Sequence, residues 1–204
     1  MKRGSKILSA LILLAAAFPA TAQLNVFACE PEWAALATEL GGDKVEVYAA
    51  TTAFQDPHHI QARPSLIAKV RRADLVICSG AELEIGWLPM LLRQAGNPAV
   101  QPGKPGYFEA SGFVTKLEIP TELDRTMGDM HASGNPHVHL DPRRLARIAE
   151  SLTGRLAELD TSNADYYESR HEDFSTRWQQ AITRWEKQAA PLKGVRAVVH
   201  HKDW

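Results

Sequence analysis

Short apolar runs alternate with helical patterns along the first half of this chain, and this alternation limits the possible folds most strongly. An apolar run at 24–28 precedes apolar residues at helical spacing in 33–40, a Gly-Gly stop and an alternating strand pattern that begins at Val45. The next segment repeats the pattern, with Pro64 near a helix start and a buried strand at 74–78. Strand–helix–strand alternation predicts a parallel sheet with flanking helices, an α/β fold.

The second half of the chain predicts two long helices. Asp141 can cap the first helix and Pro142 fits its first position. Apolar residues then recur every three or four positions, at Leu145, Ile148, Leu152, Leu156 and Leu159. The second helix is predicted from about Tyr166 to Ala190, and a helix of that length, about 37 Å, is long enough to brace two lobes.

An apolar strand pattern, "VRAVVHH", follows Gly194, and the sequence ends shortly afterwards at Trp204. A strand that starts a new layer needs partner strands, so we expect a truncated second α/β lobe here and more chain beyond it. The predicted organisation is a signal peptide at 1–22, an N-terminal α/β lobe at 23–140, helices with a long interlobe helix at 141–193, and the start of the second lobe at 194–204.

The N-terminus has the layout of a secretory signal peptide. Three basic residues surround the start of an apolar run at 7–18, and small residues permit cleavage after Ala22. We therefore expect export to the periplasm; the alternative is a retained anchor, although the run is short for a membrane span. Cleavage removes three of the 23 Lys and Arg and none of the 24 Asp and Glu, and a negative balance argues against nucleic-acid binding.

The chain has two cysteines, Cys29 and Cys78, and each ends an apolar run. Neighbouring strand ends can bring the sulfur atoms within bonding reach, and an oxidising compartment permits a disulfide. The sequence leaves two alternatives open, a bridge or two small buried thiols, and both are structural.

Six of the eight histidines fall into three tight pairs, His58/His59, His137/His139 and His200/His201. Each pair lies beside a predicted strand end or strand-to-helix loop, and such loops converge on one crevice in parallel α/β sheets. Imidazole is a common ligand of zinc and similar ions, so the pairs predict a shared metal site. Adjacent residues of an extended segment face opposite sides, and the residues alone do not choose between them. The alternative is that the pairs lie in polar surface turns.

Three motifs in order, "DPHHIQARPS", "NPHVHLDP" and "VVHHKDW", together with "ADLVICSGAELEIGWLP", resemble the metal-binding lipoprotein and periplasmic components of ABC importers for zinc and manganese. The resemblance spans essentially the whole chain after the predicted signal peptide. It implies two α/β lobes joined by one long helix, with the metal in the cleft between them. It also implies a transport protein without catalytic activity, expected to be a monomer, whose partner is an ABC permease in the inner membrane.

The resemblance selects one histidine from each pair. His58 matches the histidine after Asp-Pro, His137 the one in the Asn-Pro-His segment, and His201 the one that opens "HKDW". The second choices are His59, His139 and His200. The family's fourth ligand is an Asp or Glu late in the second lobe, beyond Trp204. Three imidazoles and a carboxylate favour Zn²⁺ over Mn²⁺ as the transported ligand.

Three further histidine positions have other predicted roles. His131 lies in a loop at 121–134, where zinc importers often carry a His- and acid-rich segment, and a solvated role is favoured over transient metal capture. His171, on the long helix, is predicted to be structural or solvent-facing. His139 stands where many relatives carry an apolar residue, so it could compete with His137 or support it through a hydrogen bond.

Two alternatives belong to other classes of protein. A secreted zinc-dependent hydrolase would combine the histidines with an activated water and a base such as Glu82 or Glu84, but no H-E-x-x-H motif occurs. A metal-sequestering adhesin on the same scaffold would hold the ion without delivering it. The sequence favours capture of zinc in the periplasm for an ABC permease.

Overall fold

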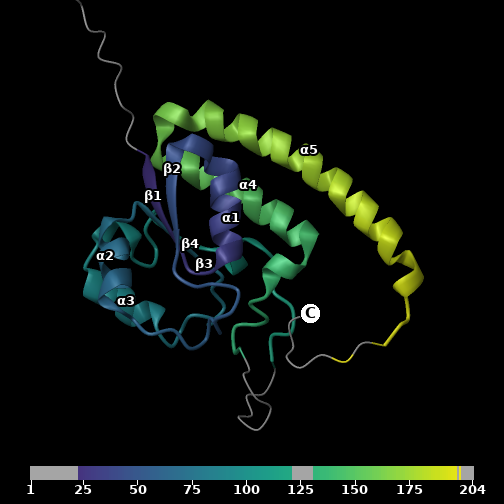
Figure 1. Ribbon diagram of the computed structural model, residues 1–204, viewed down its shortest axis with the longest axis horizontal. Helices are drawn as coiled ribbons and strands as arrows, with labels where there is room; N and C mark the ends of the chain where they lie inside the picture. The colour runs from purple at the N-terminus through teal and green to yellow at the C-terminus, as the bar shows by residue number, and fades with distance from the viewer. Residues whose placement is uncertain (1–22, 121–130, 197, 199–204) are drawn as a thin grey trace, which may run out of the picture.

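A four-stranded parallel sheet forms the centre of the molecule (Figure 1). The computed structural model describes residues 23–120, 131–196 and 198. The spatial order of the strands is β2-β1-β3-β4, and every pairing is parallel. All four strands therefore end at one edge of the sheet. Their bounds are β1 (Leu24–Ala28), β2 (Val45–Ala49), β3 (Leu75–Cys78) and β4 (Tyr107–Glu109).

Helices cover both faces of the sheet (Figure 1). On one side lie α1 (Pro31–Gly41), α4 (Pro142–Leu159) and α5 (Ala164–Ala189); on the other lie α2 (Pro64–Arg72) and α3 (Leu88–Ala95). The residues of β3 alternate between the two layers, because successive side chains of a strand point to opposite faces. Leu75 and Ile77 join the first core, Val76 and Cys78 the second, and all four are fully buried.

The buried residues of the long helix α5 extend from Tyr167 to Ile182. Tyr167 and Phe174 are buried in the core that α1 and α4 share. Trp178 stacks on Phe174, and its indole donates a hydrogen bond of 2.8 Å to the Pro142 carbonyl. Trp185, further along, is 43% exposed, and the end of the helix extends beyond the other elements in Figure 1.

The structure confirms the predicted α/β fold with a parallel sheet and flanking helices. The second predicted long helix corresponds to α5, and Asp141 caps α4 by accepting a 2.9 Å hydrogen bond from the Arg143 backbone nitrogen. The prediction was wrong for the segment that contains strand β4. The strand lies in "GNPAVQPGKPGYFEASG", whose Gly and Pro residues predict a loop, and its three residues are held by pairing with β3.

The predicted strand after Gly194 is also corrected in its first residues. Val195 and Arg196 are in no strand, and Val195 instead donates its backbone N–H to the Leu192 carbonyl at 3.0 Å, which makes a turn. Val198 is in no strand either, while positions 197 and 199, His200, His201 and the predicted signal peptide lie outside the described residues. The division into segments at 23–140, 141–193 and 194–204 stays a prediction.

A disulfide joins the carboxyl ends of β1 and β3. Cys29 and Cys78 have Cα atoms 4.9 Å apart and a sequence separation of 49. Both side chains are fully buried. Of the two alternatives that the sequence left open, the bridge is the one present, and it ties the two central strands together where they leave the sheet.

Candidate metal site

The loop between β2 and α2 presents His58 and fixes the direction of its ring. Asp56 Oδ1 lies 2.7 Å from His58 Nδ1 and accepts a 2.9 Å hydrogen bond from the His58 backbone nitrogen. The other oxygen of this carboxylate lies 3.0 Å from His59 Nδ1. These contacts lower the pKa of Asp56 far below its usual range, and the hydrogen bond with His59 has the largest effect. The carboxylate is therefore charged.

The two histidines of this loop differ in exposure and direction. The side chain of His58 is 18% exposed, whereas that of His59 is 73% exposed. With Nδ1 turned to Asp56, the His58 ring directs its Nε2 toward His131, and the two Nε2 atoms are 3.2 Å apart. His58 is therefore the member of the pair that faces the other histidines.

Four imidazoles follow one another in space, and we call His58, His131, His137 and His139 the histidine row. Neighbouring ring centroids are 5.2 Å apart for His58 and His131, 6.3 Å for His131 and His137, and 6.1 Å for His137 and His139. The row runs from the loop after β2 to the turn before α4. The fold thus gathers two of the three histidine pairs that are far apart in the sequence.

The far end of the row packs against α1. His139 meets the Trp33 ring edge-on, with centroids 6.0 Å apart, and its Nδ1 lies 3.4 Å from Glu32 Oε1. His137 is placed by the turn itself, because its backbone N–H donates a 2.9 Å hydrogen bond to Asn135 Oδ1. A carboxylate in this position can orient an imidazole, and both roles that the sequence offered for His139, competing with His137 or supporting it, stay open.

The distance between His58 and His131 fits a shared cation. Zn–N bonds of about 2.0–2.1 Å in a tetrahedral site place two nitrogen ligands about 3.3 Å apart, and the two Nε2 atoms are separated by 3.2 Å. A hydrogen bond between two neutral rings has a similar length. Both arrangements exclude a proton on each of the facing nitrogens, since two N–H groups would then point at one another.

The structure brings together two of the three predicted ligands, His58 and His137, with His131 between them. The position of His131 differs from the solvated loop role that the sequence favoured. A loop histidine belongs to no periodic pattern that would place it in the fold. The one available signal for His131 was its position in the sequence, between the "DPHH" and "NPHVH" motifs. His171 lies on α5 with Nε2 3.1 Å from Ser175 Oγ, and its predicted role as a structural or solvent-facing residue stays a prediction. His201 and the second choice His200 lie outside the described residues.

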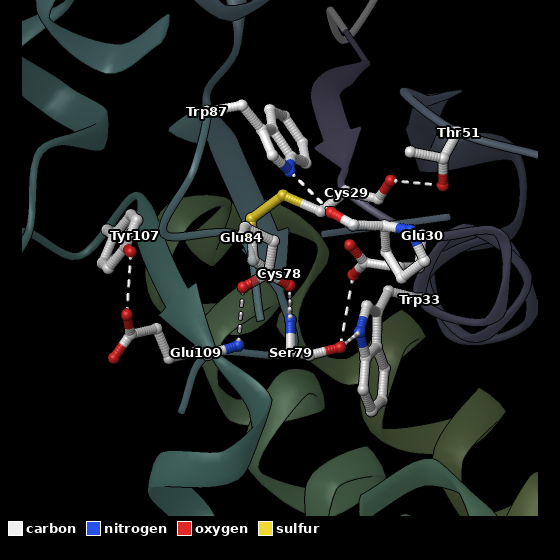
Figure 2. The surroundings of a disulfide bond; sticks show 12 residues. Cys29, Glu30, Trp33, Thr51, Cys78, Ser79, Glu84, Trp87, Tyr107 and Glu109 are labelled. Carbon is white, nitrogen blue, oxygen red and sulfur yellow. Dashed lines mark hydrogen bonds between the residues drawn. A yellow bond between two sulfur atoms is a disulfide. The ribbon is translucent and has the colours of Figure 1, made fainter. Parts of the chain in front are cut away.

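Two buried carboxyl groups, Glu30 and Glu84, lie beside the disulfide where β1 and β3 end (Figure 2). Glu84 accepts hydrogen bonds from the backbone nitrogens of Ser79 and Gly80, at 2.8 and 3.1 Å. Glu30 accepts one from Ser79 Oγ at 3.3 Å, and the Trp33 indole donates to the same hydroxyl at 2.8 Å. Glu30 and Glu84 are each only 3% exposed.

An unusual turn aims the backbone at Glu84. Three successive residues, Gly80, Ala81 and Glu82, have positive φ angles of 74°, 49° and 71°. A left-handed conformation costs on the order of 1 kcal/mol for a residue with a Cβ atom. The two hydrogen bonds that Glu84 accepts offset this cost, because they satisfy buried backbone N–H groups that would otherwise be unpaired.

Burial is the main reason that the pKa values of this pair are raised. The pKa of Glu84 rises to about 7, and that of Glu30 lies well above its usual range. The charge of Glu84 adds to the shift of Glu30. At neutral pH the pair therefore retains at least one proton.

The segment "EIGW" after β3 positions His58 although it contains no ligand. Trp87 is 1% exposed, and its indole donates a 2.8 Å hydrogen bond to the Pro57 carbonyl, next to His58. Gly86 permits the close approach of this loop, because a Cβ atom there would lie 3.1 Å from the His58 carbonyl oxygen. The Trp87 indole and the absence of a side chain at Gly86 together fix the backbone that carries the His58 ring.

Cys29, Cys78 and Glu84 form one group in the described part of the chain whose potential ligand atoms all lie within 4.8 Å of one another. In the disulfide the two sulfur atoms are bonded to each other and are not available as thiolates. The oxidised protein therefore cannot use this group as a metal site, and the histidine row is the candidate site.

Known proteins with similar sequences are components of metal transporters. The metal ABC transporter substrate-binding lipoprotein SloC of Streptococcus mutans is 25% identical over 186 residues, which are 87% of this chain and 58% of the relative. The manganese ABC transporter substrate-binding lipoprotein PsaA of Streptococcus pneumoniae is 25% identical over 178 residues, 83% of this chain and 54% of the relative. The chain spans about half the length of the curated relatives that it matches.

Solved structures share the fold. A crystal structure of ZnuA has a TM-score of 0.72 at 23% identity and covers 89% of this chain and 65% of that chain. The Zn(II)-bound AdcA structure from Streptococcus pneumoniae has a TM-score of 0.63 at 20% identity and covers 81% of this chain and 32% of that chain. At these identities the likeness shows the fold alone.

These relatives are named as substrate-binding components of metal ABC transporters, and the chain has the parallel α/β fold of the ZnuA structure. Within this class, the family model described as "ZnuA: Zinc-uptake complex component A periplasmic" matches residues 26–204. The chain belongs to the ZnuA family. Its members are substrate-binding transport proteins rather than enzymes, as the sequence predicted.

Trp87→Phe tests the positioning role of the indole. The substitution keeps an aromatic ring in the core and removes the hydrogen bond to Pro57, so we expect zinc affinity to fall by about tenfold, the lower end for losing a group that orients a ligand. Isothermal titration calorimetry measures the affinity, and far-UV circular dichroism checks the fold. Trp185→Phe, on the exposed part of α5, is the matched control. Equal zinc affinity in Trp87→Phe and the native protein would contradict the role.

Glu84→Gln tests the raised pKa. The folded-state pKa is about 7 against an ordinary value of 4.5, so the contribution of this group to stability is complete below about pH 4.5 and is lost as the pH rises through about 7. We expect the native protein to lose more free energy of unfolding between about pH 5 and about pH 8 than Glu84→Gln does. Urea denaturation at both pH values measures the difference. Parallel pH profiles would show that Glu84 titrates normally.

Proposed function

We propose that this protein captures a divalent transition metal, zinc, outside the cytoplasm and delivers it to an ABC permease for import. Membership of the ZnuA family supports the capture of metal for an ABC transporter. The observation that carries the proposal is the 3.2 Å separation of the His58 and His131 Nε2 atoms, which suits two ligands of one ion.

The proposed ligands are imidazoles from loops that are distant in the sequence. His58 and His137 contribute from the described lobe, and His131 lies between them, with its Nε2 atom 3.2 Å from that of His58. His201 is the third predicted ligand, and an Asp or Glu further along the complete protein is the fourth. The second choices remain His59, His139 and His200.

The donor set favours zinc over manganese. Imidazole suits zinc, whereas manganese prefers sites that are richer in oxygen ligands. The relatives include both kinds, since PsaA is named for manganese and the AdcA structure contains Zn(II). The chemistry of the histidine row is therefore the basis for proposing zinc.

The proposed location is the periplasm, reached through a signal peptide that is cleaved after Ala22. The lipoprotein names of the relatives support export of this chain. Within the part of the chain that the structure describes, none of the helices has the length and apolar character of a membrane span. The proposed partner is the permease in the inner membrane, and the protein is expected to act as a monomer.

The alternatives in other classes have less support. The two carboxylates suggested as bases for a hydrolase are both engaged, Glu82 with the Ala132 backbone nitrogen at 2.9 Å and Glu84 with two backbone nitrogens. A metal-sequestering adhesin differs from an importer in cells rather than in its site. A deletion strain should stop growing under chelation and recover with added zinc if the protein imports zinc; unimpaired growth would favour sequestration.

His58→Ala and His137→Ala should each weaken zinc binding by more than about tenfold, because removing a ligand costs at least as much as removing a group that orients one. Competition with a chromophoric chelator measures the affinity of the complete exported protein. His171→Ala, on α5 away from the row, is the control and should bind as the native protein does.

The zinc affinity of the native protein should also fall as the pH decreases, because protons compete for imidazole nitrogens. Native-like affinity in both His58→Ala and His137→Ala would refute the proposed site.

A further inference from the structure

The disulfide and its neighbours contain a second set of potential metal ligands, separate from the histidine row. The sulfur atoms of Cys29 and Cys78 and a carboxylate oxygen of Glu84 all lie within 4.8 Å of one another. These residues are 0%, 0% and 3% exposed. Small shifts would bring such atoms to a common ion, since Zn–S and Zn–O bonds are about 2.3 and 2.0–2.2 Å long.

Glu30 lies beside this group of three and would be the fourth donor. Its Oε2 accepts a 3.3 Å hydrogen bond from Ser79 Oγ, and its carboxyl group also forms a hydrogen bond with the Glu84 side chain. Ser79 also donates its backbone N–H to Glu84, so both carboxyl groups converge on one residue beside the disulfide (Figure 2). A cation bound between these two carboxyl groups would take the place of the proton that they share.

We propose that reduction of the disulfide creates a buried second site for a zinc-like divalent cation. Its four donors are two thiolates and two carboxylate oxygens, from Cys29, Cys78, Glu30 and Glu84. A dithiol reductant supplies two electrons and two protons: the S–S bond breaks, two thiols form, and the reductant becomes a disulfide. The cation then displaces the thiol protons and any proton that the carboxyl pair holds.

The donor set and its surroundings suit such an ion. Two sulfur and two oxygen ligands can satisfy the tetrahedral preference of zinc. Each Glu84 oxygen keeps a second lone pair beyond the one used by Ser79 or Gly80, so these hydrogen bonds can hold the ligand in place. Burial disfavours two charged carboxylates, and the charge of the ion reverses that preference. In the oxidised protein the two sulfur atoms are bonded to each other, so the site can form only after the disulfide has been reduced.

Cobalt(II) is a suitable probe because cobalt–thiolate bonds absorb in the near ultraviolet, whereas histidine and carboxylate ligands give no such charge-transfer band. The complete exported protein is reduced with a phosphine, which becomes a phosphine oxide with oxygen from water. It is then desalted without oxygen and titrated with cobalt chloride. We expect a thiolate band in the reduced protein, none in the oxidised protein, and loss of the band when zinc displaces cobalt.

Variants separate this site from the histidine row and from non-specific thiol binding. Glu84→Gln should weaken cobalt binding by the reduced protein at least about tenfold, as the loss of an orienting partner already does. Glu109→Gln is the matched control. The Glu109 carboxylate accepts a hydrogen bond from the Tyr107 hydroxyl on β4, and its replacement should leave the cobalt affinity unchanged. His58→Ala should also leave the thiolate band unchanged.

Three results would overturn the proposal. The first is a folded, reduced protein that shows no thiolate band at saturating cobalt. The second is equal cobalt affinity in Glu84→Gln and the native sequence. The third is loss of the far-UV circular dichroism signal on reduction, because a buried site of this kind requires the folded sheet.

Discussion

Parallel pairing of β1 with both β2 and β3 is the interaction on which the rest of the structure depends. Ala28 lies between Ala49 and Ile77 in register, so the three strands end together. The loops that follow them start at one edge of the sheet, where binding sites of parallel α/β folds form. The disulfide, the buried carboxyl groups and the loop that carries His58 all begin there. A register slip of one residue would send each buried strand residue to the opposite layer.

Local patterns made much of this fold predictable. The strands β1 to β3 and the helices α4 and α5 carry strong apolar periods, and Asp141 and Pro142 mark a helix start. Strand β4 was missed because three residues among Gly and Pro carry no period, and their pairing with β3 is a long-range contact. The motifs and the resemblance predicted His58 and His137 as ligands. The sequence could not place His131, since the position of a loop residue depends on packing between distant segments.

The pKa values of carboxyl groups at the same end of the sheet are shifted in opposite directions by their surroundings. Glu30 and Glu84 are buried, and loss of water raises the pKa of both. Asp56 lies in an exposed loop, where hydrogen bonds with two imidazoles lower its pKa. The same functional group therefore serves as a proton-retaining element beside the disulfide and as a fixed negative charge beside the histidine row.

The contacts of Asp56 have a consequence for selectivity. One carboxylate holds both the ring and the backbone of His58, so the ring gives up its rotational freedom when the protein folds rather than when a ligand arrives. A preorganised ring spends less entropy on binding, but it also adapts less to an ion of another radius. Discrimination between cations of equal charge would then depend on how well a rigid spacing matches their bond lengths.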